Sequence, residues 1–516
     1  MKISGPTLLI RNAELLIPSD LGSGSRQSHR HAGLRRHDGF DGSKPKPVGI
    51  ASQITDIRIA NGQIAEMGAN LSADIETIDA AGGLLLPGLH DHHIHIAATA
   101  AAMESVKCGP PEVQDTEALT ATLNQPGEFW LRGIGYHESV TGALIDRHFL
   151  DRINPTRPIR IQHRTGRMWI FNSTGLHLLL AAGPPPDSLE REAGQYTGRL
   201  FDDDAYLRHA LGACLPAFAD IGARLASYGI TGITEISPGN DDATAAYFAS
   251  EHAGGALPQR IILAGRQDLG VLGLPAGITL GPFKIHLHEA HLPEYDSTVA
   301  AIRAAHERNR SVAVHCVTEV ELVFTLAAFR EAGRIPGDRI EHASVTPEDS
   351  LAEIAAQNLI VVTQPHFVTE RGDTYRAAIP KAEWPHLYRL ESFRAAGITL
   401  AAGSDSPFGD PNPWAAMHAA VTRRTAMGAR LGPDEALSPE AAISLFLRDP
   451  ADLTRSREIS IGAPADLCLL AQQWRELRQN LSAARIRATF IGGRLIQDRI
   501  DQPQPQRGLG ADTLAR

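Results

Sequence analysis

Short apolar runs alternate with longer amphipathic stretches over much of the chain. From about Asp91 onward, runs rich in β-branched residues are each followed by helical patterns such as DSTVAAIRAAHERN, with Asp, Glu or Pro near the starts and Gly or Asn near the ends. This alternation is typical of βα units around a parallel sheet. The predicted strands are residues 91–96, 229–236, 260–265, 283–287, 312–316, 339–343, 359–364 and 398–404. Eight such units predict an α/β fold, a TIM-like (β/α)8 barrel.

The two ends of the chain show a different pattern. Short alternating strands with Gly or Asn turns occupy residues 1–84 and return at 456–500, so we expect one small composite β-sandwich domain. Within it, residues 19–49 are rich in Gly, Ser, Arg and His and are predicted to be disordered. The barrel is expected over 85–455, with an inserted subdomain at about 97–228, and residues 501–516 are expected to be a mobile tail.

Composition narrows the classes of partner. The chain has 516 residues, with 49 Lys and Arg against 59 Asp and Glu, and this net charge of -10 disfavours nucleic acid and favours a small-molecule substrate. No apolar run approaches the ~20 residues of a membrane helix. Four widely spaced cysteines and an N-terminus without a secretory pattern indicate a cytoplasmic protein. The sequence permits a homodimer and does not predict one.

Histidine is abundant, with 22 copies, and several of them lie at regular positions in the predicted strands. In PGLHDHHIH, His93 and His95 are two apart on a strand, so they share a face and are able to hold one metal ion. Lys284, His315, His342 and Asp405 also fall at or near the C-terminal ends of predicted strands, where barrel active sites are built. Each alone is explained by packing or capping, but together they would be an unfavourable cluster of desolvated groups unless a metal compensates them.

These motifs resemble the amidohydrolase superfamily of metal-dependent hydrolases. The likeness rests on the PGLHDHHIH segment, the strand ligands, GSD at 403–405 and the C-terminal GAPADLCLL, while VVTQPHF and FNSTGL are similar to the N-substituted formamide deformylase branch. The resemblance implies two divalent metals, zinc being our first expectation. His93, His95 and Asp405 would bind one ion and His315 and His342 the other, with Lys284 bridging them as a carbamate formed with CO2.

The implied reaction is hydrolysis of an amide-like C–N bond, N-acyl or N-formyl, by metal-bound hydroxide with Asp405 as general base and acid. Arg167 stands where the branch usually has a histidine, which favours a substrate with an acidic group. His163, Gln364 and His366 are further candidates for substrate binding, and Asp91 is expected to orient ligands. Two alternatives stay open: a mononuclear aminohydrolase of a heterocycle in which Lys284 is structural, and a non-catalytic scaffold.

Overall fold

The computed structural model describes residues 7–16, 52–72, 74–110, 112–127, 129–212, 215–270 and 273–498. The predicted disordered segment at 19–49 and the predicted tail at 501–516 lie outside these residues. By its contacts the chain divides into two compact units: Ile96–Ile221 forms one, and the chain up to His95 and from Gly222 onward forms the other. Within the described residues, no helix is long and apolar enough to cross a membrane.

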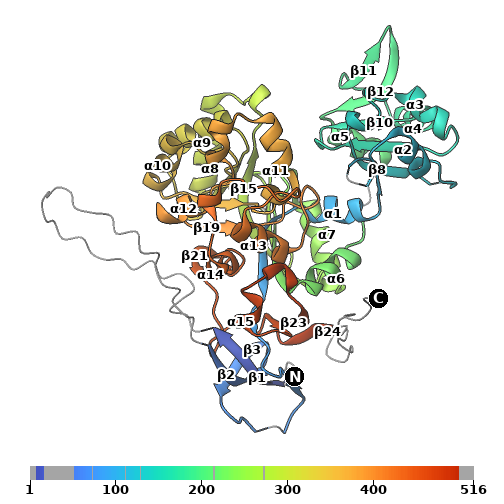
Figure 1. The fold of residues 1–516 in the computed structure, drawn as a ribbon. Helices are drawn as coiled ribbons and strands as arrows, with labels where there is room; N and C mark the ends of the chain where they lie inside the picture. Colours follow the sequence, from blue (N-terminus) through green and yellow to red (C-terminus); the bar gives the residue numbers. More distant parts are fainter. Residues whose placement is uncertain are drawn as a thin grey trace, which may run out of the picture. The chain divides into compact units, whose positions relative to one another are not determined.

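A parallel eight-stranded sheet forms the centre of the larger unit (Figure 1). Its neighbours run in the order β19-β18-β17-β16-β15-β14-β13-β6. The strands are β6 (Leu89–Ile94), β13 (Ile230–Glu235), β14 (Arg260–Gly265), β15 (Ile278–His286), β16 (Val312–Cys316), β17 (Arg339–His342), β18 (Ile360–Thr363) and β19 (Leu400–Ala402). Every one overlaps a strand predicted from the sequence, so the barrel expectation is confirmed.

Hydrogen bonds beyond the strand ends link the last strand to the first. The Asp405 amide donates to the His93 carbonyl at 2.7 Å, and the His95 amide donates to the Ser406 carbonyl at 3.0 Å. The sheet is therefore nearly closed at its C-terminal end. This closure brings the segment after β19 directly against the end of β6, which matters for the site described below.

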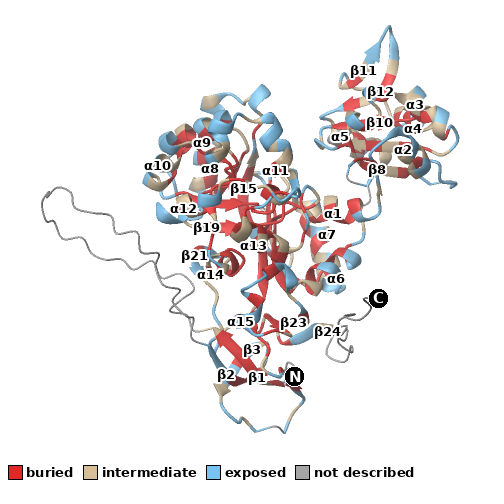
Figure 2. Ribbon diagram, in the orientation of Figure 1, coloured by how far each residue is buried: buried red, intermediate tan, exposed pale blue. Residues whose placement is uncertain are grey.

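Helices alternate with the strands along the chain, as the sequence pattern predicts. The capping of α9 shows why they start where they do, because the Thr318 hydroxyl and the Glu321 carboxylate form a capping box. In Figure 2 the barrel strands are buried while the helices expose their outer faces. The helices are α6 (Ala219–Ser227), α7 (Asp242–Ala253), α8 (Tyr295–Glu307), α9 (Glu319–Ala332), α10 (Glu348–Ala356), α11 (Phe367–Ala378), α12 (Glu391–Ala395), α13 (Pro413–Thr422) and α14 (Pro439–Ser444).

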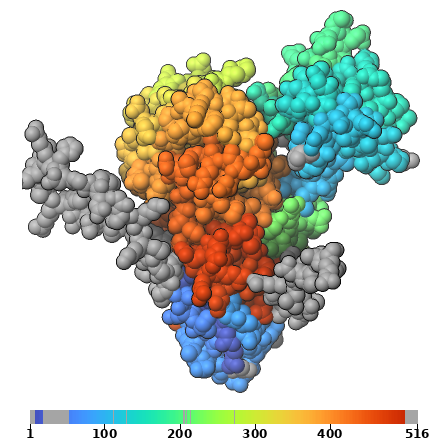
Figure 3. Space-filling view, viewed as in Figure 1, coloured from blue at the N-terminus to red at the C-terminus, as the bar shows by residue number. Residues whose placement is uncertain are grey.

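Two four-stranded sheets from the chain ends share one apolar core. The first runs β3 (Gln63–Gly68), β2 (Ser52–Ala60), β1 (Leu8–Leu16), β4 (Thr77–Asp79), and the second runs β24 (Arg494–Asp498), β23 (Ile486–Ile491), β22 (Leu467–Leu470), β5 (Leu85–Pro87). Ile10 and Ile57 from the first pack in one cluster with Leu467 and Phe490 from the second. In Figure 3 the blue and red segments accordingly lie against each other. This is the predicted small β-sandwich; the short α15 (Trp474–Leu477) follows β22.

The inserted unit has a sheet and cores of its own. Its six strands run in the order β11-β12-β10-β9-β8-β7. Two apolar clusters, one around Leu119 and Ile161 and one around Trp169 and Leu200, fill it. The unit consists of β7 (Val106–Lys107), β8 (Leu131–Tyr136), β9 (Ile159–His163), β10 (Met168–Phe171), β11 (Leu189–Glu192), β12 (Gln195–Phe201), α1 (Ile96–Met103), α2 (Thr116–Leu123), α3 (Arg147–Ile153), α4 (Ser173–Leu180) and α5 (Asp204–Leu211).

Candidate metal centre

The six predicted ligands come from the C-terminal ends of neighbouring barrel strands. His93 is in β6 and His95 follows it; Lys284 is in β15, His315 in β16 and His342 at the end of β17, and Asp405 follows β19. Because parallel strands end on the same side of a barrel, these side chains converge. Ring centroids are 5.4 Å apart for His93 and His95, 4.7 Å for His93 and His342, and 4.5 Å for His315 and His342.

Asp405 lies at the middle of the convergence. Its Oδ1 is 3.3 Å from His93 Nε2 and 3.2 Å from His95 Nε2, and its Oδ2 is 4.0 Å from His342 Nδ1. One donor atom each from His93, His342 and Asp405 lies within 4.8 Å of the other two. That spacing suits a single ion bound by imidazole and carboxylate. Burial opposes ionisation of Asp405, but the neighbouring His93 and His95 outweigh burial and lower its pKa well below the usual value.

Two of these ligands have a left-handed backbone. The φ angle is 71° at His342 and 53° at Asp405, and Ala343 after the histidine has a φ of 48°. Such angles are unfavourable for residues with a Cβ and are found where surrounding structure enforces them. At Asp405 the backbone hydrogen bond to His93 supplies that constraint. The strained backbone therefore aims the carboxylate at the histidines.

One ring nitrogen in each of three histidines, His93, His95 and His342, is held by a neighbour. His93 Nδ1 is 2.5 Å from Glu341 Oε2, and His342 Nδ1 is 2.8 Å from Gln364 Oε1. Since a carboxylate and an amide oxygen only accept, both Nδ1 atoms donate, and the lone pair of each ring is on Nε2. His95 Nδ1 lies 2.8 Å from Ser237 Oγ. These imidazoles are thus prepared for metal binding.

Glu341 connects the histidines to a buried cation. Its Oε1 accepts a hydrogen bond from Arg339 Nε at 2.6 Å, while Oε2 faces His93. Burial opposes ionisation of Glu341, but Arg339 and His93 outweigh it, so its pKa is lowered and it stays a carboxylate. Burial alone would lower the pKa of His93, but Glu341 and Asp405 outweigh it and raise that pKa. Glu341 and Ser237 were not predicted from the sequence. A charged pair two apart in the apolar strand RIEHA was the available signal for Glu341.

Lys284 is the most unusual group of the centre. It is only 4% exposed, and its Nζ has no hydrogen-bond partner among the described residues. Burial lowers its pKa to about 8, only partly offset by the carboxylate of Glu341. His342 Nε2 likewise has no partner in the described part of the chain. A buried amine and a buried imidazole nitrogen without partners among the described residues, beside a carboxylate, fit a divalent metal better than an apolar core.

Three residues after or within the same strands support the ligands. Asp91 Oδ1 accepts from the His93 amide at 3.1 Å and from the Ser404 amide at 2.9 Å, the orienting position expected from the sequence. Gln364 and His366 are buried, the first on His342 and the second with Nε2 3.0 Å from the Ser404 carbonyl. Their hydrogen bonds hold the centre in place, and a contact with substrate stays a prediction for both.

The other two predicted substrate residues belong to the inserted unit. Arg167 forms two hydrogen bonds with the Asp202 carboxylate, at 2.8 and 2.6 Å, and is partly exposed. His163 Nε2 is 3.0 Å from Glu138 Oε2, and its Nδ1 is 2.9 Å from Thr165 Oγ1. Within their own unit both side chains therefore have polar partners, and their role toward a substrate stays a prediction.

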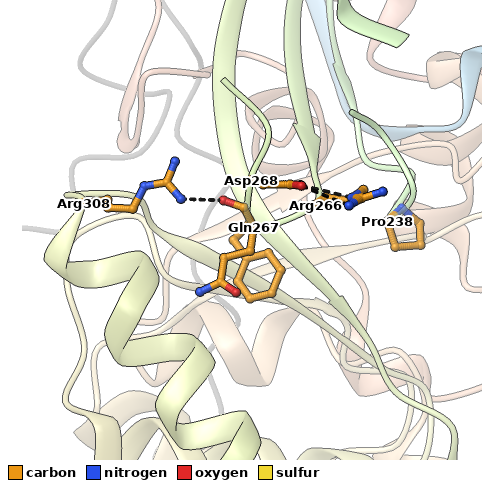
Figure 4. Close-up of a pocket in the computed structure, with 6 residues that line it drawn as sticks. Pro238, Arg266, Gln267, Asp268 and Arg308 are labelled. Atoms are coloured by element: carbon orange, nitrogen blue, oxygen red, sulfur yellow. Dashed lines mark hydrogen bonds and ion pairs between the residues drawn. The ribbon is translucent and has the colours of Figure 1, made fainter. Parts of the chain in front are cut away.

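An open pocket elsewhere on the barrel carries no comparable chemistry. Its polar side chains are already engaged, because Arg266 pairs with Asp268 at 2.9 Å and Arg308 donates to the Gln267 carbonyl at 2.8 Å (Figure 4). None of the six predicted ligands lines it. The lining residues are Pro238, Arg266, Gln267, Asp268, Phe283 and Arg308.

Comparisons with known proteins agree with this geometry. The chain is 24% identical over 485 residues to the N-substituted formamide deformylase of Arthrobacter pascens, covering 80% of this chain and 89% of the relative. It is 23% identical over 499 residues to the putative amidohydrolase YtcJ of Bacillus subtilis (strain 168), covering 83% and 92%. An uncharacterized metal-dependent hydrolase from Pyrococcus horikoshii OT3 has a similar fold, with a TM-score of 0.71 at 16% identity over 93% of this chain and 99% of that one.

The family model for amidohydrolases matches residues 76–497, a range that takes in the whole barrel and all six predicted ligands. The resemblance expected from the sequence motifs is thereby confirmed. The chain belongs to the amidohydrolase family.

Proposed function

We propose that this protein is a binuclear metal hydrolase that cleaves the C–N bond of an N-acyl or N-formyl compound. The observation that carries the proposal is the buried Lys284 amine, which has no hydrogen-bond partner among the described residues and lies at the end of the barrel that holds the four histidines and Asp405. The name of the Arthrobacter relative supports an N-substituted formamide as one kind of substrate.

His93, His95 and Asp405 would hold one ion, His315 and His342 the other, and Lys284 would join them after conversion to a carbamate. When bound, the metals supply Lewis acidity that lowers the pKa of water and polarises a carbonyl oxygen. Carbamate formation needs a neutral amine, and a pKa of about 8 makes that form accessible near neutral pH. Zinc suits the imidazole and carboxylate donors, and other transition metals suit them as well.

The residues of the chain handle the proton. Asp405 stays ionised because His93 and His95 lower its pKa, so its carboxylate can accept the proton of the attacking water. The same carboxyl then delivers that proton to the leaving nitrogen, which departs as an amine. Glu341 keeps His93 in the tautomer with a free Nε2 and stays out of the proton transfer itself.

Metal content and turnover test the proposal together. Purified, metal-loaded protein should hold two ions per chain and hydrolyse members of a panel of N-formyl amines, N-acyl amines and lactones. Lys284→Ala should lose the second ion and the activity, while the exposed Lys381→Ala should keep both. Isotope-labelled bicarbonate should give a carbamate carbon signal by NMR in the wild type only. Absence of turnover on every C–N and C–O substrate would contradict the proposal.

A mononuclear aminohydrolase is the second candidate, since His93, His342 and Asp405 by themselves bring three donors within reach of one ion. It predicts one ion per chain and an active Lys284→Ala variant. The two candidates are therefore separated by the stoichiometry measured in the same experiment.

An acidic substrate group is a finer part of the proposal. It rests on the Arg167 guanidinium, whose planar fork suits a carboxylate as it suits Asp202 here. Arg167→Ala should reduce kcat/KM for an acidic N-acyl substrate by roughly tenfold or more, the loss of one charge-assisted pair. A neutral amide of similar size should lose little. Equal losses of kcat/KM on both substrates would show that Arg167 does not recognise the charge of the substrate.

A further inference from the structure

A continuous row of imidazoles leads from the rim of the barrel into the metal centre. Consecutive ring centroids are 4.7 Å apart from His288 to His286, 4.3 Å from His286 to His315, and 4.5 Å from His315 to His342. The row continues at 4.7 Å to His93. Only the last three of these residues belong to the proposed ligand set, so His286 and His288 extend it outward.

The backbone explains why these two rings join the row. His286 is the last residue of β15 and pairs in register with His315 of β16, and their rings are stacked at an interplanar angle of 14°. His288 still has an extended backbone, with φ -136° and ψ 122°. Residues two apart on an extended chain share a face, so Lys284, His286 and His288 follow one another on the same side.

The rim segment is fixed in this position. Leu287, between the two histidines, is 1% exposed and anchors the segment in the core. The Glu289 amide donates to Glu321 Oε1 at 3.0 Å, which ties the segment to the first turn of α9. His286 is exposed and His288 is half-buried, whereas His342 and His93 are buried. The outer part of the row is therefore accessible to solvent, and its inner end is buried.

We propose that His286 and His288 form an entry site that captures a divalent transition metal at the rim and passes it to His315. The proposal rests on the metal centre described above. A bare dication entering a buried site loses its hydration at a large cost in free energy, and successive imidazoles replace that hydration step by step. Two imidazole nitrogens on one zinc ion lie roughly 3–3.5 Å apart, given Zn–N bonds of about 2.0–2.1 Å. Metal capture would therefore require side-chain rotation that brings neighbouring ring nitrogens of the row to that separation.

Metal uptake by the metal-free full-length protein tests the entry site. Cobalt uptake is followed by its absorbance after mixing with one equivalent of Co²⁺, release is followed into excess chelator, and final metal content is measured by mass spectrometry. His288→Ala should slow uptake and release by the same factor, tenfold or more, and leave affinity unchanged, because a route alters rates in both directions equally. His286→Ala/His288→Ala should be slower still.

His291→Ala is the matched control, since His291 is exposed on the same rim segment and its ring is outside the row. It should load as the wild type does. Thermal unfolding of the metal-free variants checks that each is folded. Equal uptake rates in His288→Ala and wild type would overturn the entry site. If the variant also had a raised KM, these residues would be substrate contacts instead. A wild type that binds no metal at equilibrium would instead contradict the proposed function.

Discussion

Three histidines of the centre are held by neighbours of different character: a carboxylate for His93, a hydroxyl for His95 and an amide oxygen for His342. A charged partner raises the basicity of the imidazole more than a neutral one does. Metal binding by His93 therefore depends on its partner more than metal binding by His95 or His342 does. It also depends on Arg339, because the same carboxylate balances that buried guanidinium.

Replacing Glu341 tests this dependence. Glu341→Gln should weaken metal affinity by about 10- to 100-fold, the usual effect of losing such a partner. It should also reduce the free energy of unfolding by about 3–5 kcal/mol, because Arg339 is left buried without its counter-charge. Competition with a chelator and urea unfolding measure the two effects. Glu66→Gln, which breaks the exposed pair with Arg58, is the control and should change neither by much.

The pKa of Lys284 predicts a pH dependence of stability. Its pKa is about 8 in the folded protein and 10.5 ordinarily, so between these values the unfolded chain binds more protons at this position. The stability of the metal-free protein therefore rises with pH through that window. Below that window the amine is protonated in both the folded and the unfolded state, and burial of the ammonium lowers the stability by its full amount.

Urea unfolding in CO2-free buffer compares wild type with Lys284→Met from pH 7 to 10.5. The variant should be the more stable at pH 7, and its advantage should shrink as pH rises above about 8. Lys381→Met, at an exposed position, should show a constant difference. A constant difference for Lys284→Met would show that the amine is not destabilised by burial.

At the residue scale, the candidate ligands were predicted from the sequence, but the residues that hold them were not. His93, His95 and Lys284 are visible because their spacing and strand positions are local in the chain. Ser237 and Glu341 contact histidines 142 and 248 residues away, so no local pattern relates them. For Arg167 the sequence suggested recognition of an acidic substrate group, and only the fold reveals that Asp202 pairs with it.

At the scale of the elements, Asp338 connects three of them at the end of the barrel opposite the metal centre. Its Oδ1 accepts from the Val312 amide at 2.8 Å and lies 3.1 Å from His306 Nε2, while Oδ2 accepts from the Ile335 amide at 2.7 Å. One buried carboxylate thus ties α8, the start of β16 and the turn before β17. Its loss should loosen these elements without reaching the ligands.

Asp338→Asn leaves at least one buried backbone donor facing an NH₂ group. We expect the free energy of unfolding to fall by about 2–4 kcal/mol, the range for lost bonds to a charged acceptor plus an unsatisfied donor. Urea unfolding measures this, and metal content should stay at the wild-type value. Asp296→Asn on the exposed start of α8 should be nearly neutral. A loss of metal from Asp338→Asn would mean that the two barrel ends are coupled.

The elements of the barrel were predictable because each strand is a buried apolar run bounded by turns. The ends of the strands were harder to predict. The strand β15 begins at Ile278, five residues before the predicted start at Phe283. The polar and glycine residues in ITLGPF gave no sign of its pairing with β14. The inserted subdomain was predicted from the sequence, but its sheet was not. Its sheet pairs segments that no periodicity relates, such as β8 with β7 and β9.

For the whole molecule, two separate sets of cores predict two responses to metal removal. The inserted unit has its own apolar clusters and none of the six ligands. A metal held at 100 times its Kd stabilises the unit that binds it by about 2.7 kcal/mol. Chelation should therefore affect only the barrel.

Scanning calorimetry tests this with and without chelator. One transition should move down by a few degrees on chelation and a second should keep its Tm. Chelator already saturated with zinc is the control and should move neither transition. A joint shift of both would show that the inserted unit unfolds with the barrel.

The shared core of the β-sandwich also has a consequence in time. Strands β1 to β3 end at Gly68, and their partners in the second sheet begin at Leu467, apart from β5. At roughly 5–20 residues per second, a ribosome needs roughly 20–80 s to make the roughly 400 residues between them. During that interval Ile10, Ile57 and Ile59 lack most of the second sheet, which buries them in the folded protein. Synthesis of this protein therefore includes a period in which its first sheet is open to aggregation and to chaperones.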